Sequence, residues 1–149
     1  MIVRIVEVDY DQKPEDAIYA TNRSEYLNNE VVKTMPKNNN KGKRKVEVCF
    51  FPLRAYKTVN QVDEMLREHG LTPDPYAICK VNQEDRDFSK THPNGTQWQD
   101  KQGNHCYVTF YDWSGKPCVY CYRYEDDWSG RWWVGGVREQ SLAAEPLEN

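Results

Sequence analysis

Short segments rich in Val, Ile, Tyr and Phe predict five β-strands, because these residues favour extended backbone. The first strand is expected over residues 2–9, and the second over residues 45–51, where Pro52 ends it. The other three are expected over residues 105–112, 117–125 and 131–137. Two Gly-containing connections of hairpin length separate these last three, so we expect a three-stranded antiparallel meander.

One helix is strongly indicated over residues 59–69. Thr58 and Gln61 have the spacing of a capping box, and Gly70 follows as a C-terminal stop. Between these signals the apolar residues repeat at helical spacing, at Val62, Met65 and Leu66. This helix therefore has one apolar stripe with which to pack against a sheet.

The rest of the chain gives weaker signals. Asp74-Pro75 has the form of an N-cap followed by a first-turn proline and predicts a helix to about Val81, and Pro14 opens a shorter one. Residues 17–35 are left unassigned between helix and strand. Residues 36–45 and 82–102 are polar and rich in turn formers, so we expect loops there.

The register of the meander divides its side chains between two faces. Centring the first turn on Ser114-Gly115 pairs Val108 with Cys121, and centring the second on Trp128-Ser129 pairs Tyr124 with Trp133. One face is then apolar and suits packing against the helix at 59–69; it carries Cys106, Val108, Phe110, Val119, Cys121 and Val134. The other is aromatic and carries Tyr107, Thr109, Tyr111, Cys118, Tyr120, Tyr122, Tyr124 and Trp133.

The aromatic face is the most informative feature for function. Tyr and Trp dominate the hot spots of protein interfaces, and they also stack on bases and sugars. Two interpretations stay open, an exposed contact platform and a second core layer covered by the N-terminal half of the chain. The turn tryptophans are separate candidates, either as exposed anchors or as lids on the core. The candidate partner-binding residues are Tyr107, Tyr111, Tyr120, Tyr122, Tyr124, Trp133, Trp113 and Trp128.

Cysteines, histidines and acids do not form a recognisable catalytic or metal-binding motif. Cys118 and Cys121 lie three positions apart in a predicted strand, so their thiols point to opposite faces and cannot share a metal or a disulfide. The three histidines and the scattered acids lack the spacing of a zinc site, a calcium loop or a nucleophilic pair. We therefore expect buried structural cysteines, no cofactor and no metal.

Charge bears on the choice of partner. The 149 residues include 20 Lys and Arg against 23 Asp and Glu, which gives a net charge of -3. One basic cluster in the loop at 36–45 could contact phosphate, through Lys41, Lys43, Arg44 and Lys45. The acidic balance disfavours nucleic acid, and we expect this cluster to be a flexible solvated loop.

These patterns together predict an α+β protein. We expect an antiparallel sheet, made of the C-terminal meander and the N-terminal strands, with two or three helices packed on one face. Residues 1–138 would form one globular domain and residues 139–149 a flexible acidic tail. The absence of a long apolar run and of a secretory signal predicts no membrane association and a cytoplasmic location.

The predicted function is a small non-enzymatic module that binds another protein. This prediction follows from the aromatic excess and from the absence of a catalytic motif. Two alternatives remain: a binder of single-stranded nucleic acid or glycan, and a small enzyme whose site cannot be recognised from residue order.

Overall fold

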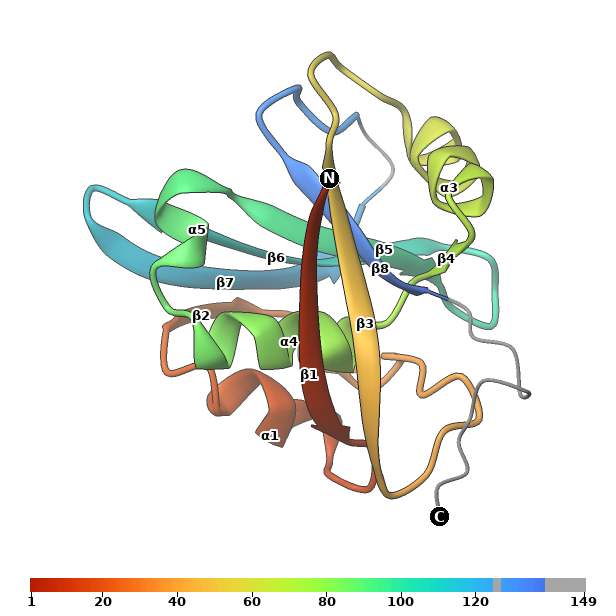
Figure 1. Cartoon of the computed structure of the whole chain (residues 1–149), viewed down its shortest axis with the longest axis vertical. Helices are drawn as coiled ribbons and strands as arrows, with labels where there is room; N and C mark the ends of the chain where they lie inside the picture. The colour runs from red at the N-terminus through yellow and green to blue at the C-terminus, as the bar shows by residue number, and fades with distance from the viewer. Residues whose placement is uncertain (125–126, 139–149) are drawn as a thin grey trace.

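The computed structural model describes residues 1–124 and 127–138. An eight-stranded mixed sheet forms the centre of the fold (Figure 1). The strands are β1 (Ile2–Asp9), β2 (Ser24–Leu27), β3 (Lys43–Pro52), β4 (Leu71–Thr72), β5 (Asn94–Gln99), β6 (His105–Trp113), β7 (Lys116–Arg123) and β8 (Trp133–Arg138). Their spatial order is β1-β3-β8-β5-β6-β7-β2, and β4 pairs with β8. Most neighbours are antiparallel, but β5 and β8 are parallel, as are β2 and β7. The fold is therefore α+β, with a mixed sheet where an antiparallel one was expected.

Five helices complete the described part of the chain: α1 (Pro14–Tyr19), α2 (Asn29–Val32), α3 (Val59–Glu68), α4 (Pro75–Glu84) and α5 (Phe88–Thr91). The caps of α3 and α4 are those predicted. The Thr58 hydroxyl accepts a hydrogen bond from the Gln61 amide at 3.1 Å, and the Gln61 side chain accepts one from the Thr58 amide at 2.9 Å. Asp74 accepts one from the Ala77 amide at 3.0 Å. The predicted tail at 139–149 lies outside the described residues.

The predicted meander is only partly correct. The β6–β7 hairpin has the predicted register, with Val108 opposite Cys121. However, β8 does not follow β7 as a third strand, since it lies between β3 and β5. Gly135 and Gly136 make this central position possible, because a Cβ on Gly135 would lie 2.6 Å from the Phe50 ring and one on Gly136 2.9 Å from the Thr72 carbonyl. The parallel strand β2 occupies the place beside β7.

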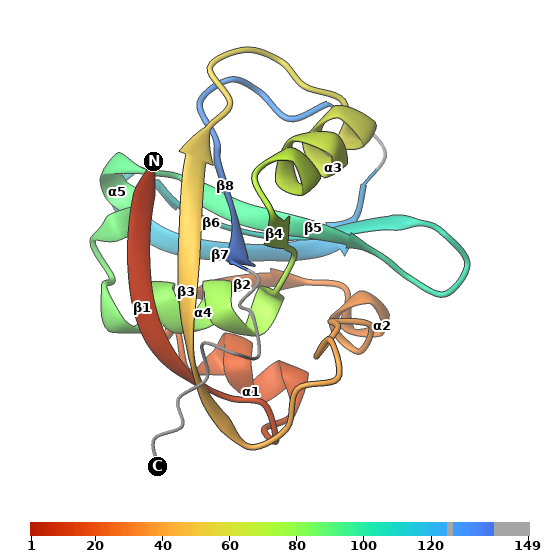
Figure 2. The same ribbon diagram turned by 45° about the vertical axis from the view of Figure 1, so that its right-hand side comes forward.

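Helices cover both faces of the sheet, which corrects the expectation of helices on one face (Figure 2). Residues of α1, α2, α4 and α5 share one core cluster with Val108 and Phe110 of β6. Val62 and Leu66 of α3 belong to a second cluster, with Phe51 and Val134. The predicted packing of α3 on the Val108 face is thus wrong, since α4 lies there. An apolar stripe along a helix predicts that the helix packs on a sheet, but it does not predict which face of the sheet the helix covers.

Three strands were not predicted: β2, β4 and β5. β5 was expected to be loop because its sequence, Asn94 to Gln99, is polar, yet all its residues except Gln99 are buried. Its polar side chains are hydrogen-bonded instead, as Asn94 shows by exchanging bonds of 2.8 and 3.1 Å with Asn82 of α4. β2 lies in the segment that was left unassigned.

The basic loop is more firmly attached than its composition indicates. Lys43 is already part of β3 and pairs with Asp9 of β1. The Gly42 amide donates to the Asp11 carboxylate at 2.9 Å, and the Asn38 side chain donates to the Pro73 carbonyl at 2.9 Å. The basic side chains are exposed, as predicted, but backbone and amide groups anchor the segment that carries them.

Candidate functional site

An aromatic cleft lies where β6 and β7 meet residues 127–132, the segment that leads into β8. It has a volume of about 210 Å³ and is lined by Tyr107, Thr109, Tyr111, Tyr120, Tyr124, Asp127, Trp128, Arg131 and Trp132. Tyr107, Thr109 and Tyr111 occupy alternate positions of β6 and so share one face of the sheet, and Tyr120 of β7 lies opposite Thr109. Thr109 is small and 95% buried, with 5% of its surface exposed. The cleft is a hollow between larger rings.

The rings of the cleft form a continuous series of contacts around the hollow. Tyr107 and Trp128 lie 6.3 Å apart at 70°, Trp128 and Trp132 lie 5.8 Å apart at 89°, and Trp132 and Tyr111 lie 5.6 Å apart at 90°. Tyr111 then stacks on Tyr120 at 5.4 Å. Edge-to-face pairs at these distances are favourable beyond the area that they bury, so the walls support each other.

Backbone contacts hold the wall formed by residues 127–132. Trp128 and Lys57 exchange two backbone hydrogen bonds, of 2.8 and 3.0 Å, and the Arg54 amide donates to the Gly130 carbonyl at 2.9 Å. The approach is so close that a Cβ on Gly130 would lie 2.7 Å from the Ala55 amide nitrogen. The glycine therefore allows the two loops to join.

A buried hydrogen-bonded chain fixes the Trp128 ring. Its indole N–H donates to Gln97 Oε1 at 2.8 Å, and Gln97 Nε2 donates to Asp63 Oδ1 and to the Val59 carbonyl, both at 2.7 Å. The other carboxylate oxygen of Asp63 lies 2.9 Å from His105 Nε2. Gln97 comes from β5 and Asp63 from α3, so the chain links the cleft to the helix.

The two ends of the cleft carry opposite charges. The Arg131 guanidinium lies 5.3 Å from the centre of the Tyr111 ring and 4.9 Å from that of Trp132. At the other end, the Tyr124 ring lies 5.1 Å from Tyr107, and the Tyr124 hydroxyl donates to the Asp127 carbonyl at 3.1 Å. Both charged side chains are exposed.

Two tyrosines of the cleft remain neutral well above neutral pH. A hydrogen bond with Tyr111 raises the pKa of Tyr120 to about 12, and burial raises the pKa of Tyr107. Their hydroxyls therefore serve as hydrogen-bonding groups, not as anions.

The cleft brings together five of the eight predicted aromatic residues: Tyr107, Tyr111, Tyr120, Tyr124 and Trp128. Of the two interpretations of Trp128, the lid is correct, since only 4% of the residue is exposed. Tyr122 lies beside the lining, with its ring 6.4 Å from that of Tyr120. Trp113 is 61% exposed at the end of β6 and is not part of the cleft.

Trp133 must be reassigned to the opposite face. It packs against the cluster that contains α4, and its ring lies 4.8 Å from His92. The predicted pairing of Trp133 with Tyr124 assumed that β8 continues the meander. Because β8 pairs with β3 and β5 instead, Trp133 and Val134 exchange the faces predicted for them.

Five lining or neighbouring residues were not predicted as site residues: Tyr26, Thr109, Asp127, Arg131 and Trp132. Arg131, Trp132 and Asp127 flank the turn at Trp128-Ser-Gly130, and their proximity to a predicted aromatic turn was the available signal. Tyr26 of β2 stacks on Tyr120 at 4.7 Å. Nothing in the sequence indicated it, because the parallel pairing of β2 and β7 joins segments about ninety residues apart.

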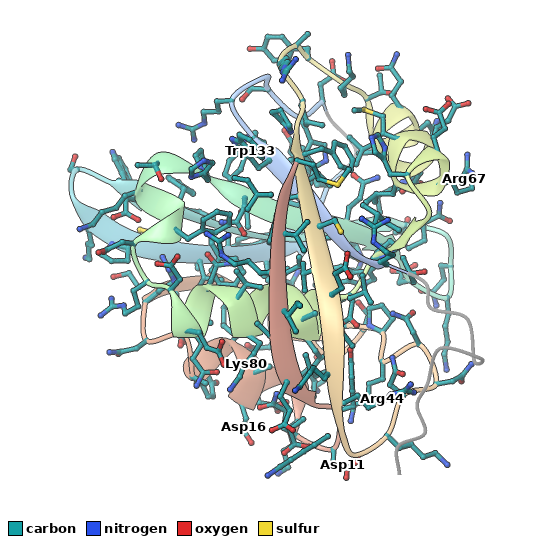
Figure 3. The ribbon with its side chains drawn as sticks, in the orientation of Figure 1. Asp11, Asp16, Arg44, Arg67, Lys80 and Trp133 are labelled. Carbon is teal, nitrogen blue, oxygen red and sulfur yellow. The ribbon has the colours of Figure 1, made fainter. Side chains whose placement is uncertain are left out.

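The basic cluster lies away from the cleft. Figure 3 shows Arg44 near the start of β3 and Trp133 near the opposite end of that strand. The ten residues of β3 correspond to about 30 Å of extended chain. Lys43 and Lys45 lie opposite the acidic residues Asp9 and Glu7 in the register of β3 and β1. The phosphate-contact candidates Lys41, Lys43, Arg44 and Lys45 are therefore not assembled with the aromatic residues.

The cysteines occupy the positions predicted for CxxC in a strand. Cys118 pairs with Tyr111 and Cys121 with Val108, so the two thiols lie on opposite faces of β7. All five cysteines are buried. Within residues 1–124 and 127–138, no cluster of three or more potential metal ligands occurs. None of the helices in that part of the chain is both long and apolar enough to cross a membrane.

Comparisons with protein-family models, with curated proteins and with solved structures found no match for this chain. Inference about function therefore depends on the geometry and chemistry of the cleft.

Proposed function

We propose that this protein is a small non-enzymatic binding module that holds another protein at the aromatic cleft. The observation that carries the proposal is a preformed hollow of about 210 Å³ whose walls are tyrosine, tryptophan and arginine. These three residue types are the ones enriched among the hot spots of protein interfaces. A hollow of this kind suits a protruding side chain of the partner.

The walls are also fixed before binding, which favours affinity. The Trp128 indole is hydrogen-bonded to Gln97, and residues 127–132 are joined by backbone hydrogen bonds to the segment after β3. A site whose side chains are already ordered loses little conformational entropy when the partner arrives.

The location of the basic residues gives the nucleic-acid alternative less support. A single strand needs cations along its backbone as well as rings for its bases. Here the cluster at Lys41, Lys43, Arg44 and Lys45 lies at the far end of β3, and the net charge is -3. We further propose a cytoplasmic location, because free thiols such as Cys49, Cys79, Cys118 and Cys121 suit a reducing compartment.

The proposal can be tested by selecting displayed random peptides on the immobilised protein. Selected peptides are then titrated against the wild-type protein and a Thr109→Leu variant, in which the larger side chain fills the hollow. We expect binding to weaken by about 30-fold or more, the equivalent of about 2 kcal/mol. Tyr111→Ala removes a wall instead of filling the hollow and provides a second variant if Thr109→Leu does not fold.

Trp113→Ala is the matched control, since it removes an exposed aromatic residue outside the cleft. It should change the affinity less than twofold, a difference within about 0.4 kcal/mol. A selection that enriches no binding peptide would contradict the proposal. Peptides that bind Thr109→Leu normally but lose affinity for Trp113→Ala would place the interface at the β6–β7 turn instead.

A further inference from the structure

We infer that the cleft recognises a basic side chain, arginine or lysine, of the partner protein. This inference rests on the proposed function and adds the chemistry of the group that enters the hollow. The orientation of the rings, the cation that the cleft already contacts and the acidic residue at one end all favour a basic group.

The orientation of the rings provides an electron-rich lining. Successive rings from Tyr107 through Trp128 and Trp132 to Tyr111 meet at 70°, 89° and 90°. All four rings line the hollow, and neighbouring rings stand at steep angles to one another. The face of an aromatic ring carries partial negative charge, so such a hollow attracts a cation more strongly than a neutral group of the same shape.

The cleft already contacts one cation of its own chain. The Arg131 guanidinium lies 4.9 Å from the Trp132 ring centre and 5.3 Å from that of Tyr111, within the 6 Å range of cation–π contacts. In the described part of the chain, no cation lies over Tyr107 or Trp128. Tyr107, at the other end of the hollow, can therefore receive a second cation.

An acidic residue lies at that other end. Asp127 lines the cleft next to Tyr124, whose ring lies 5.1 Å from Tyr107. Asp127 is exposed and forms no ion pair with any of residues 1–124 or 128–138. A basic side chain that enters the hollow beside Tyr107 and Tyr124 thus gains an acidic neighbour in Asp127. The net charge of -3 favours the approach of a basic partner.

The test compares two peptides that differ only in charge. Gly-Arg-Gly and Gly-citrulline-Gly, both with blocked ends, are titrated against the protein at low salt, with tryptophan fluorescence as the readout. We expect saturable binding of the arginine peptide, at least about fivefold tighter than that of the citrulline peptide. Added salt should weaken the arginine peptide only, because screening acts on charge.

Asp127→Asn should reduce the arginine preference to less than about twofold. Asp16→Asn on α1 is the matched control, because it removes the same charge from an exposed position far from the cleft (Figure 3). It should leave the preference unchanged. An equal effect of both variants would show that net charge, not the cleft, selects the peptide.

Failure of this inference can be distinguished from failure of the proposed function. Equal affinities for the two peptides, or no saturable binding of the arginine peptide up to about 50 mM, would overturn the preference for a cation. If displayed peptides still bind and still lose affinity for Thr109→Leu, the binding function stands with another ligand class. Tighter binding of a Gly-Glu-Gly peptide, abolished by Arg131→Gln, would reverse the assigned charge.

Discussion

Replacing Gln97 by Leu should destabilise the protein and release the Trp128 wall of the cleft. Gln97 is only 1% exposed, and its side-chain amide joins three elements. It accepts a hydrogen bond from the Trp128 indole and donates to Asp63 and to the Val59 carbonyl, at 2.7 to 2.8 Å. Leu is of similar size but can form none of these bonds, so the variant isolates their contribution.

The expected loss follows from the groups left without a partner. A buried polar group that loses its hydrogen bond costs about 1–3 kcal/mol. The Trp128 N–H loses its bond to Gln97 outright, whereas Asp63 keeps its contact with His105. We therefore expect the free energy of unfolding to fall by about 3 kcal/mol, a large part of the 5–15 kcal/mol typical of a folded protein.

Urea unfolding followed by tryptophan fluorescence measures this loss, and the slope of the transition should not change. Gln99→Leu is the matched control, two residues further along β5 on the same face. Gln99 is exposed and contacts Asp63 and His105 only at 3.4 Å, so its loss should stay below about 1 kcal/mol. Equal losses in the two variants would refute the reasoning, because packing alone would then hold Trp128.

Three further outcomes are expected. Burial raises the pKa of Asp74 to about 6, so as the pH is lowered the folded protein binds a proton at a higher pH than the unfolded chain does. Relative to Asp74→Asn, the wild-type protein should therefore gain about 2–3 kcal/mol of stability from pH 7 to pH 4. A difference in urea unfolding that does not depend on pH would contradict this. Gly130→Ala would place a Cβ 2.7 Å from the Ala55 amide nitrogen. We expect a loss of about 1–3 kcal/mol of stability, seen as a melting temperature lowered by several degrees. An unchanged melting temperature would mean that the two loops can move apart without cost. Tyr107→Ala should cost about 3 kcal/mol or more because Tyr107 packs against the core around α3, while Tyr122→Ala, outside that cluster, should cost less than half as much in the same urea assay.

Local signals predicted local structure well. The caps of α3 and α4 depend on residues three positions apart, and both have the predicted hydrogen bonds. The β6–β7 register was also predictable, because a short turn fixes which residues oppose each other. In these cases the interacting residues are close in the sequence, so the local pattern is sufficient to predict their contacts.

Placement across the sheet was not predictable in the same way. β8 lies between β3 and β5, and this position depends on the close approach of Gly135 to Phe50. The glycine pair is visible in the sequence, but the residue that it approaches is not. The single error in the partner of β8 then moved Trp133 to the wrong face of the sheet.

Residues of the site that depend on contacts between distant segments were also not predictable, and the polar residues were the hardest to predict. The rings of β6 and β7 were predictable because alternation groups them on one face. Gln97, which orients Trp128, lies in a segment whose polar character predicted a loop. A polar residue can be buried in a central strand only when other elements satisfy its hydrogen bonds, as Asp63 of α3 does here. The property that concealed β5 in the sequence is therefore the property that fixes the wall of the cleft.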